Sequence, residues 1–587
     1  MPVQAFHPKT VYELLQHSAQ TYAERIALTY ISSLIPPVSG VTPTISDKHV
    51  SYRQLLDNVN RTARMVLDLS GKSKPVVSLL LPNIPQSQYL LWAAASVGIA
   101  NPLNPLLSED ALYSLMLKAQ SDLIFVLGPL PESDLWQKTL SVAQRLPNQP
   151  KCIPVMTQGS EQCFDALLDL YSAAELEPEL RPRADDVAAY FHTGGTTGLP
   201  KLACHSHANQ VAAARAYMHS MECGPGDVTL NGLPIFHVAG ALVNSLGGLA
   251  SGVQMLLPTL GGFRNPEVIR QHWRLVEHYG ITISGGIPTS VASMLEVPLN
   301  GHNIGSLRYM LAGGAPVPAA LCEQVQAITG LNLYQGYGMT ECAGVITLPN
   351  LQQPSIPGSA GHVSGEVELR IDGDHGFGEI CVKGPTVFPG YLGQSEAPLV
   401  DGWLRTGDLG HLDEHGNLFI TGRTKDLIIR SGHNIDPAMI ENCLENHPAV
   451  LMAAAVGMPD EYAGELPVVF VQLRQGHQAN INELLQFAFE HIAERPACPK
   501  QVFLLDALPL TAVGKIYKQR LRELAAGSLF RQRIALHCGL LDVEVTQQRD
   551  GSLLLCLEGV PVEHLTWCTE QARSLGMHLQ QTETLLS

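Results

Sequence analysis

The sequence predicts an α/β protein with a large N-terminal region, a smaller α+β domain and a short extra C-terminal α/β tail. Helical patterns alternate with buried apolar runs from the start of the chain to about residue 340, then short strands and turns begin near residue 361. A compact helix-and-strand unit follows from about residue 426. At 587 residues the chain is too long for one core and is expected to form two to four folding units.

The first elements alternate between helix and strand. Residues 10–30 are amphipathic at helical spacing, and residues 86–100 also read as a helix. Residues 74–82 and 121–128 are nearly continuous apolar runs, typical of strands in a parallel sheet that is covered on both faces. The Pro-, Ser- and Thr-rich residues 31–49 are predicted to form a surface loop.

Four further apolar runs continue the alternation, and several of them end in glycine. In open α/β sheets the ligand crevice lies beyond the carboxyl ends of the strands, so these ends are where we expect the chemistry. The four runs are residues 252–258, 281–288, 306–314 and 331–338.

The rest of the chain divides into three parts. Residues 365–385 and 401–429 are predicted to form β-hairpins of a β-rich subdomain. In the α+β unit, helices are predicted at 437–450 and 481–494 and strands at 450–459 and 466–473. The tail is predicted to form a hairpin over 541–559, turning at Asp550–Gly551, and then a helix over 561–575.

Composition excludes several classes of protein. There are 37 basic and 54 acidic residues, a net charge of −17, and no basic stripe, which argues against nucleic acid as a partner. We expect no secretory signal and no transmembrane segment, because the most apolar stretches are broken by Asn and Pro. The 12 cysteines form no C-x-x-C pair, which argues against a zinc site and a disulfide framework and favours a cytoplasmic location.

The stretch HTGGTTGLPK at residues 192–201 carries the first functional signal. Backbone amides around Gly194, Gly195 and Gly198 can point into one concavity. The hydroxyls of Thr196 and Thr197 add donors, and Lys201 adds a cation. It is not a Walker A loop, because proline precedes the lysine and leucine follows it, and G-x-G-x-x-G is absent. By itself the stretch is either a polyphosphate loop or a surface turn.

Seven more motifs follow in order, and together the eight resemble the adenylate-forming superfamily of acyl- and aryl-CoA synthetases, peptide-synthetase adenylation domains and firefly-type luciferases. The resemblance spans roughly residues 5–525. The seven are LPIFHVAG at 233–240, LAGGAPVP at 311–318, YQGYGMTE at 334–341, GEICVKGPTVFPGYL at 378–392, WLRTGDLG at 403–410, GRTKDLIIRSGHNIDPAMIE at 422–441 and LPLTAVGKIYK at 508–518.

The resemblance implies that the protein binds ATP, Mg²⁺ and coenzyme A and joins a carboxylic acid to CoA through an acyl-adenylate. It implies that Lys515 supports adenylation, that Thr340 lies near the α-phosphate and that Glu341 and Thr196 bind Mg²⁺. The remaining implied nucleotide contacts fall into three groups. They are Thr193, Gly194, Gly195, Thr196, Thr197, Gly198 and Lys201 for the phosphates, Gly313, Gly314, Ala315, Tyr337 and Gly338 for adenine, and Asp408 with Arg423 for the ribose.

The resemblance also implies domain alternation. Its boundaries would be an AMP-binding domain at 1–421, a hinge at 422–426 containing Lys425, a mobile domain at 427–524 and an extension of unknown role at 525–587. Gly432 would then line a pantetheine tunnel.

The expected acid pocket is formed by residues 237–241, 285–289 and 313–314. His237 stands where amino-acid-activating relatives usually carry Asp, which disfavours an amino acid because its ammonium would be left unpaired. Either a fatty or an aryl or alicyclic acid fits. His237 either gates the carboxylate or is a packed core histidine.

A free-standing CoA ligase is the leading expectation, with a ligase that loads a separate acyl carrier protein or a non-catalytic nucleotide-binding scaffold as alternatives. A homodimer is an option. Two residues depart from the family pattern in or beside the loop. Gly195 replaces the more familiar serine, which removes one hydroxyl donor, and Leu202 stands where relatives often have a small residue.

Overall fold

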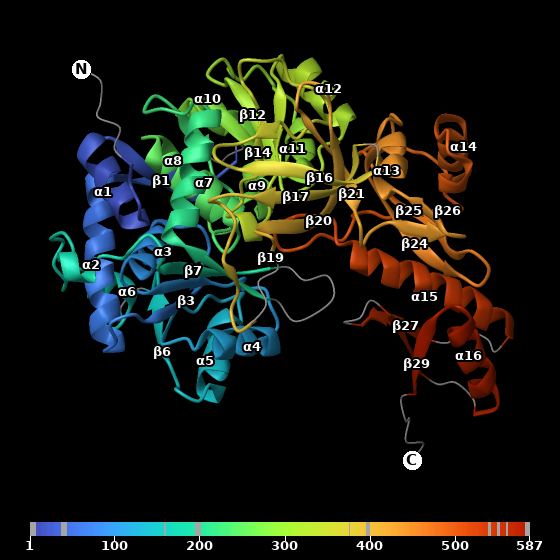
Figure 1. Ribbon diagram of the computed structural model, residues 1–587, viewed down its shortest axis with the longest axis horizontal. Helices are drawn as coiled ribbons and strands as arrows, with labels where there is room; N and C mark the ends of the chain where they lie inside the picture. The colour runs from blue at the N-terminus through green and yellow to red at the C-terminus, as the bar shows by residue number, and fades with distance from the viewer. Residues whose placement is uncertain are drawn as a thin grey trace.

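Two seven-stranded sheets form the base of the large N-terminal region (Figure 1). The computed structural model describes residues 7–36, 44–157, 160–193, 201–374, 376–394, 399–537, 542–548, 552–558 and 562–581. One sheet has the order β18-β8-β7-β4-β3-β5-β6 and the other β13-β12-β11-β9-β10-β1-β2. Most neighbouring strands in both sheets are parallel, as the alternating sequence pattern predicts.

Strand bounds in the first sheet are β3 (Val76–Leu80), β4 (Ile99–Pro102), β5 (Leu123–Leu127), β6 (Lys151–Val155), β7 (Val187–His192), β8 (Leu202–Ser206) and β18 (Gly390–Tyr391). In the second sheet they are β1 (Ile26–Leu34), β2 (Ile45–Ser51), β9 (Val228–Leu230), β10 (Gln254–Pro258), β11 (Ile283–Gly286), β12 (Tyr309–Gly313) and β13 (Leu333–Gly336). Every residue of β3 and β5 is buried, because helices cover both faces of a parallel sheet.

The helices of this region start and end at ordinary capping signals. The second helix begins at a capping box of Ser51 and Gln54 and ends at Gly71 in the left-handed conformation. The α-helices are α1 (Val11–Thr21), α2 (Tyr52–Ser70), α3 (Pro85–Val97), α4 (Glu109–Ala119), α5 (Leu135–Arg145), α6 (Phe164–Leu168), α7 (His207–Ser220), α8 (Gly247–Ala250), α9 (Pro266–Arg270), α10 (His272–Tyr279), α11 (Pro288–Leu295) and α12 (Ala319–Thr329). Short helices of other types are η1 (Pro178–Leu180), the π-helix η2 (Ala239–Leu246), η3 (Gly262–Arg264) and η4 (Thr340–Cys342).

A β-rich subdomain follows, as predicted, and its hairpins form a five-stranded sheet of β16, β17, β19, β20 and β21. Its strands are β14 (Thr347–Leu348), β15 (His362–Val363), β16 (Glu368–Asp374), β17 (Phe377–Lys383), β19 (Leu399–Val400), β20 (Trp403–Leu412) and β21 (Leu418–Arg423). A separate hydrophobic core that includes Ile380, Phe388 and Leu418 holds this sheet together.

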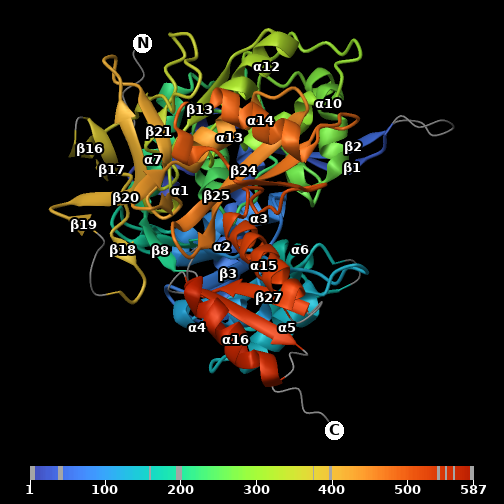
Figure 2. The same cartoon turned by 90° about the vertical axis from the view of Figure 1, so that its right-hand side faces the viewer.

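The C-terminal α+β unit packs beside the large region (Figures 1 and 2). Its five-stranded sheet has the order β23-β22-β25-β24, with β26 paired to β25. The elements are β22 (Ile428–Arg430), β23 (His433–Ile435), α13 (Pro437–Glu445), β24 (Val450–Asp460), β25 (Gly464–Leu473), α14 (Ile481–His491), η5 (Arg495–Ala497), β26 (Gln501–Leu504) and α15 (Lys518–His537).

The tail has its own small core. The strands β27 (Asp542–Gln547), β28 (Leu553–Glu558) and β29 (Met577–Gln581) form a sheet beside α16 (Val562–Ser574). The predicted antiparallel strand pair and helix are present, and the predicted turn at Asp550–Gly551 lies outside the described residues. The parallel strand β29 was not predicted. Helix α15 runs straight through position 525, where the sequence boundary of the extension was placed, and its residues Phe530 and Ile534 join the tail's core.

Two predictions of secondary structure were wrong at their boundaries. The helix expected over 10–30 ends at Thr21, and β1 pairs in parallel with β10 more than 200 positions away, a partner that local periodicity cannot reveal. The loop expected over 31–49 instead contains the end of β1 and most of β2, which pair antiparallel. Within the described ranges, none of the helices combines the length and apolar character needed to cross a membrane.

We expect Phe530→Ala to loosen the tail. The phenyl ring is fully buried between α15 and the tail's sheet, so its removal should cost about 3–5 kcal/mol of local stability. Limited proteolysis should show faster cleavage C-terminal to residue 518. Phe489→Ala is the control, because Phe489 is 51% exposed; equal proteolysis of the two variants would contradict the shared core.

Candidate active site

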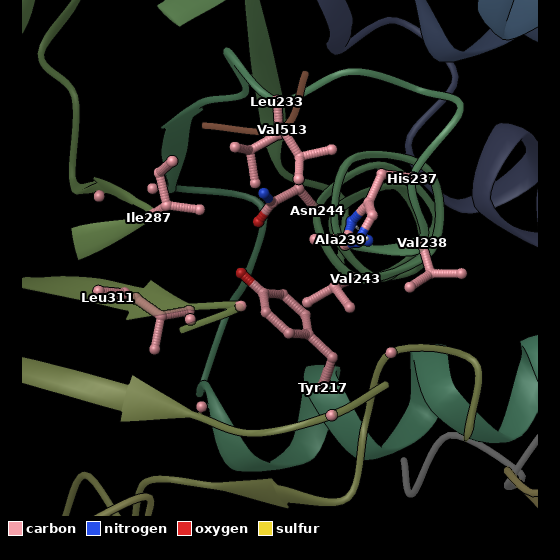
Figure 3. Close-up of a pocket in the computed structure, with 18 of the residues that line it drawn as sticks. Tyr217, Leu233, His237, Val238, Ala239, Val243, Asn244, Ile287, Leu311 and Val513 are labelled. Atoms are coloured by element: carbon pink, nitrogen blue, oxygen red, sulfur yellow. Dashed lines mark hydrogen bonds between the residues drawn. The ribbon is translucent and has the colours of Figure 1, made fainter. Parts of the chain in front are cut away.

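A cavity opens where the strands β11, β12 and β13 end, the place at which an open parallel sheet binds its ligand (Figure 3). Its walls are mostly apolar, and its lining comes from the second sheet, from η2 and from the C-terminal unit. The predicted pocket segments 237–241, 285–289 and 313–314 all contribute to it. The lining includes His237, Val238, Ala239, Gly285, Gly286, Ile287, Leu311, Gly313, Gly314, Tyr337, Gly338, Val513 and Lys515.

The C-terminal unit delivers Lys515 to this cavity on a tight turn. Gly514 has φ +84° and its carbonyl accepts a hydrogen bond from Thr289 Oγ1 at 3.0 Å. A Cβ at Gly514 would lie 2.3 Å from Ile287 Cδ1, and the positive φ would strain any other residue, so glycine is strongly favoured there. The Lys515 side chain then lies against Gly314, with Cε 3.3 Å from the position of a Cβ on that glycine.

The surroundings of Lys515 determine its charge. Burial, with a smaller contribution from the nearby Arg423, outweighs the opposing effect of the Asp408 and Glu341 carboxylates and lowers the pKa of Lys515 to about 8. At neutral pH the side chain is therefore still mostly an ammonium, although it has been removed from bulk water. A cation placed this way is suited to attract and screen anions.

Asp408 stands at the centre of a hydrogen-bonded group at the edge of the β-rich subdomain. The Tyr337 hydroxyl donates to Oδ2 at 2.6 Å, and Arg423 Nε donates to Oδ1 at 2.8 Å. Asp408 and Arg423 are paired residues of β20 and β21. Because the carboxylate is only 5% exposed and already paired, it is fixed in place to accept further donors.

Glu341 is held in a comparable way by residues from another sheet. It lies in η4, is buried, and accepts a hydrogen bond on Oε1 from the Tyr391 hydroxyl at 2.5 Å. The Lys201 ammonium lies over the Tyr391 ring, 4.8 Å from its centroid. Lys201 and Thr193 flank the glycine–threonine loop, and the Thr193 amide donates to the Lys201 carbonyl at 2.8 Å.

The preceding residue, Thr340, is positioned through its backbone. His205 Nε2 donates to the Thr340 carbonyl oxygen at 2.7 Å. Burial lowers the pKa of His205 to about 4, so the ring is neutral, and its buried Nδ1 has no hydrogen-bond partner among the described residues. His205 belongs to β8, which directly follows the loop.

His237 is half-buried and uncharged. Removal from water, with smaller contributions from the neighbouring Lys515 and His192, lowers its pKa to about 3. Its Nδ1 accepts a hydrogen bond from the Ala239 amide at 3.2 Å, which leaves the proton on Nε2. As a member of the cavity lining, the ring can offer a neutral donor to a ligand.

Small residues let backbone segments meet at the rim of the cavity. A Cβ at Gly338 would lie 2.1 Å from the Gly344 carbonyl oxygen, and one at Gly313 would lie 3.0 Å from the Gly336 carbonyl oxygen. Ala315 follows Gly314 in the same segment and is half-buried.

Five predicted site residues lie outside the described residues, and two described ones lie away from the cavity. Gly194, Gly195, Thr196, Thr197 and Gly198 lie outside the described residues. Lys425, between β21 and β22, and Gly432, between β22 and β23, are exposed and do not line the cavity.

Sequence reasoning missed two supporting residues, Tyr391 and His205. Both lie inside or beside recognised motifs, in PGYL and immediately after the loop, but nothing in the local pattern shows that they contact Glu341 and Thr340. Among the described residues, no group of three or more His, Cys, Asp or Glu side chains could hold a metal by itself. Glu341 is a single buried carboxylate that is not part of any such group.

The sequence matches two family models and several acid–CoA ligases of known sequence. A family model described as "AMP-binding enzyme" matches residues 15–392, and one described as "AMP-binding enzyme C-terminal domain" matches residues 439–515. The marinolic acid–CoA ligase of Pseudoalteromonas sp. (strain SANK 73390) is 34% identical over 88% of this chain and 81% of its own length. A long-chain-fatty-acid–CoA ligase of Bacillus subtilis is 30% identical over 88% and 94%.

Solved structures agree with the sequence matches. The ATP-bound MatB of Rhodopseudomonas palustris has a TM-score of 0.76 and 26% identity, covering 89% of this chain and 99% of its own. The o-succinylbenzoate CoA synthetase of Bacillus subtilis, in complex with an acyl-adenylate intermediate, has a TM-score of 0.70 and 27% identity, covering 87% and 97%.

We expect the Lys515 amine to titrate well below an ordinary lysine. Competitive labelling with an amine-reactive anhydride, read by mass spectrometry, should give a midpoint near pH 8 rather than about 10.4. Because Asp408 favours the ammonium form, Asp408→Asn should move the midpoint lower still. A midpoint in the ordinary range, or an upward shift in the variant, would contradict the electrostatic assignment.

Proposed function

We propose, for a chain that belongs to the AMP-binding enzyme family, that it is an ATP-dependent acid–CoA ligase that forms an acyl-AMP and then an acyl-CoA. The observation that carries this proposal is the convergence of Lys515, Asp408 and Glu341 beside an apolar cavity. The names of the relatives support it, and they include a long-chain fatty acid and o-succinylbenzoate, an aryl acid. The substrate is a small-molecule carboxylic acid.

The nucleotide is assigned to the rim of the cavity. Asp408 would accept hydrogen bonds from the ribose hydroxyls, with Arg423 fixing its orientation. Tyr337 lines the cavity and is held through its hydroxyl, so its ring can stack on adenine alongside Gly313, Gly314 and Ala315. Thr193 and Lys201, at the two ends of the glycine–threonine loop, would then flank the phosphates.

The residues present fit Mg²⁺ bound as part of its ATP complex. Glu341 supplies one buried carboxylate, which is what Mg²⁺ takes from a protein when phosphates and water provide its other oxygens. The predicted second donor, Thr196, lies outside the described residues. When bound, the ion would neutralise charge on the phosphate oxygens.

In the first half-reaction a carboxylate oxygen of the acid attacks the α-phosphorus of ATP, and pyrophosphate leaves. The two reacting groups are both anions, so their approach needs a positive charge in a site from which water is largely excluded. Lys515 would supply that charge from the direction of Gly314. His237 Nε2–H would orient the carboxylate as a neutral donor.

In the second half-reaction the CoA thiol attacks the acyl carbonyl and AMP leaves. The arrangement seen here, with Lys515 in the cavity, fits the first step. We assign residues 422–426 to the hinge and residues 427–524 to the domain that rotates, so that Gly432 can then reach the thiol path. That rotation would break the 2.5 Å ion pair between Arg474 of the C-terminal unit and Glu296 of the large region.

We assign the protein to the cytoplasm, where ATP and CoA are available. A homodimer is a further proposal, which light scattering of the purified chain would test.

Lys515→Ala should lower acid-dependent ATP–pyrophosphate exchange about 10²–10³-fold, by analogy with the loss of one oxyanion donor. Thioester formation from preformed acyl-adenylate should fall much less. Lys500→Ala removes an exposed lysine of the same unit and should leave exchange unchanged. Exchange at the wild-type rate in Lys515→Ala would refute the role of this residue.

Lys425→Pro should slow acyl-CoA formation without slowing adenylate formation. Proline fixes φ near −65° and restricts Thr424, so it would stiffen the proposed hinge. Adenylate formation should persist while acyl-CoA formation slows, as measured by single-turnover assays of each step. Normal CoA turnover in this variant would rule out Lys425 as the hinge.

A further inference from the structure

The lining of the acid cavity runs from the glycine ends of β11 and β12 back along β11 to Ile283 and along β9 to Thr229, while Tyr309 lies behind it. Gly313 is the last residue of β12 and Tyr309 the first, and at ~3.3 Å per residue they are roughly 13 Å apart. Lys515 contacts Gly314 at the outer end. At the inner end the Cys223 thiol lies 3.9 Å from the Tyr309 hydroxyl and also interacts with the hydroxyl of Tyr217, which lines the cavity.

Two polar groups point into this inner end. In Figure 3 the Tyr217 hydroxyl and the Asn244 side-chain amide are directed into the cavity and toward each other. Tyr217 is buried, and the partner of its hydroxyl is a thiol, which is a weak hydrogen-bonding group. The Asn244 side chain makes no hydrogen bond to any residue in the described part of the chain.

The local structure holds both side chains in place. Asn244 belongs to the π-helix η2, a rare form that is frequent at functional sites. The Gly247 amide donates to the Asn244 and Leu242 carbonyls, which closes this helix. A Cβ at Gly247 would lie 2.6 Å from Tyr217 Cδ1, so a glycine is needed for the phenol ring to lie where it does.

No residue that lines the inner end carries a full charge, and the nearby ion pair of Arg308 with Asp227 lies behind the lining, beside Tyr309. Among the described lining residues the basic groups are Lys515 and His237, both toward the outer end, and none is Asp, Glu or Arg. Burial raises the pKa of Tyr217 well above its ordinary value, so the phenol remains a neutral donor. A charged group on a ligand would be left unpaired there, which is costly.

We propose that Tyr217 and Asn244 recognise a neutral oxygen function, a hydroxyl or carbonyl, at the end of the acid remote from its carboxylate. A hydroxyl can accept from Tyr217 and donate to the Asn244 amide oxygen, and a carbonyl can accept from both residues. This inference rests on the proposed acid–CoA ligase function and narrows its substrate class to oxygenated acids. An unsubstituted chain would bury the amide without a partner and would be selected against.

The test compares acids that differ only at the far end. CoA-dependent AMP release is measured with octanoic, decanoic and dodecanoic acids, their ω-hydroxy counterparts and decanedioic acid. At the best-fitting length, kcat/KM for the hydroxy acid should exceed that for the plain acid by about 10- to 100-fold. A preference for the plain acid or for the diacid at every length would overturn the inference.

Two variants localise the effect. Asn244→Leu and Tyr217→Phe should each bring the ratio of kcat/KM for hydroxy to plain acid toward one. Tyr334→Phe is the matched control, because its hydroxyl contacts the Gln353 carbonyl and it does not line the cavity, so the ratio should stay as in the wild type. An unchanged ratio in both pocket variants would also overturn the inference.

Isothermal titration calorimetry of the same acid pairs tests this inference independently of the proposed ligase activity. If no acid yields AMP or supports pyrophosphate exchange, the ligase proposal fails, yet the binding preference still decides the inference. Tighter binding of the hydroxy acid that disappears in Asn244→Leu supports it, and equal binding of the two acids contradicts it.

Discussion

The ammonium group of Lys515 enters the cavity from the C-terminal unit, whereas most of the cavity wall belongs to the large region, and the other site residues are arranged around that charge. Asp408 and Glu341 favour the ammonium, whereas burial and Arg423 disfavour it. The balance leaves a cation that is poorly hydrated but still charged at neutral pH. Such a group can draw two anions together more strongly than an exposed lysine would, because less water screens it.

The large region provides the backbone rim and the carboxylates that surround the Lys515 ammonium. Its strands end in glycines, so backbone rather than side chains lies at the rim, and Lys515 can rest directly against Gly314. Its carboxylates are held by residues from different sheets, Asp408 by Tyr337 and Glu341 by Tyr391. These contacts fix the negative groups before any ligand binds, so little reorganisation is left for the reaction itself.

The sequence was most informative where a residue type is required by local geometry. The turn before Lys515 needed glycine, the buried strands were continuous apolar runs, and both were predictable from the chain alone. Contacts between distant segments could not be predicted from the chain, because they depend on tertiary packing. Examples are the pairing of β1 with β10, the hydrogen bond from His205 to Thr340 and the approach of Tyr217 to Asn244. The π-helix that carries Asn244 has no periodicity that a helix pattern would detect.

Helix α15 links the C-terminal extension to the proposed hinge. Near its start, Lys518 pairs with Glu441 at 2.7 Å and Arg522 with Asp426 of the hinge at 2.6 Å. Further along the same helix, Phe530 and Ile534 enter the core of the extension. Because a single helix is shared, the extension is attached to the C-terminal unit without a flexible joint. If that unit rotates between the two half-reactions, the extension must travel with it, and a ligand or partner that held the extension still would act on the same hinge.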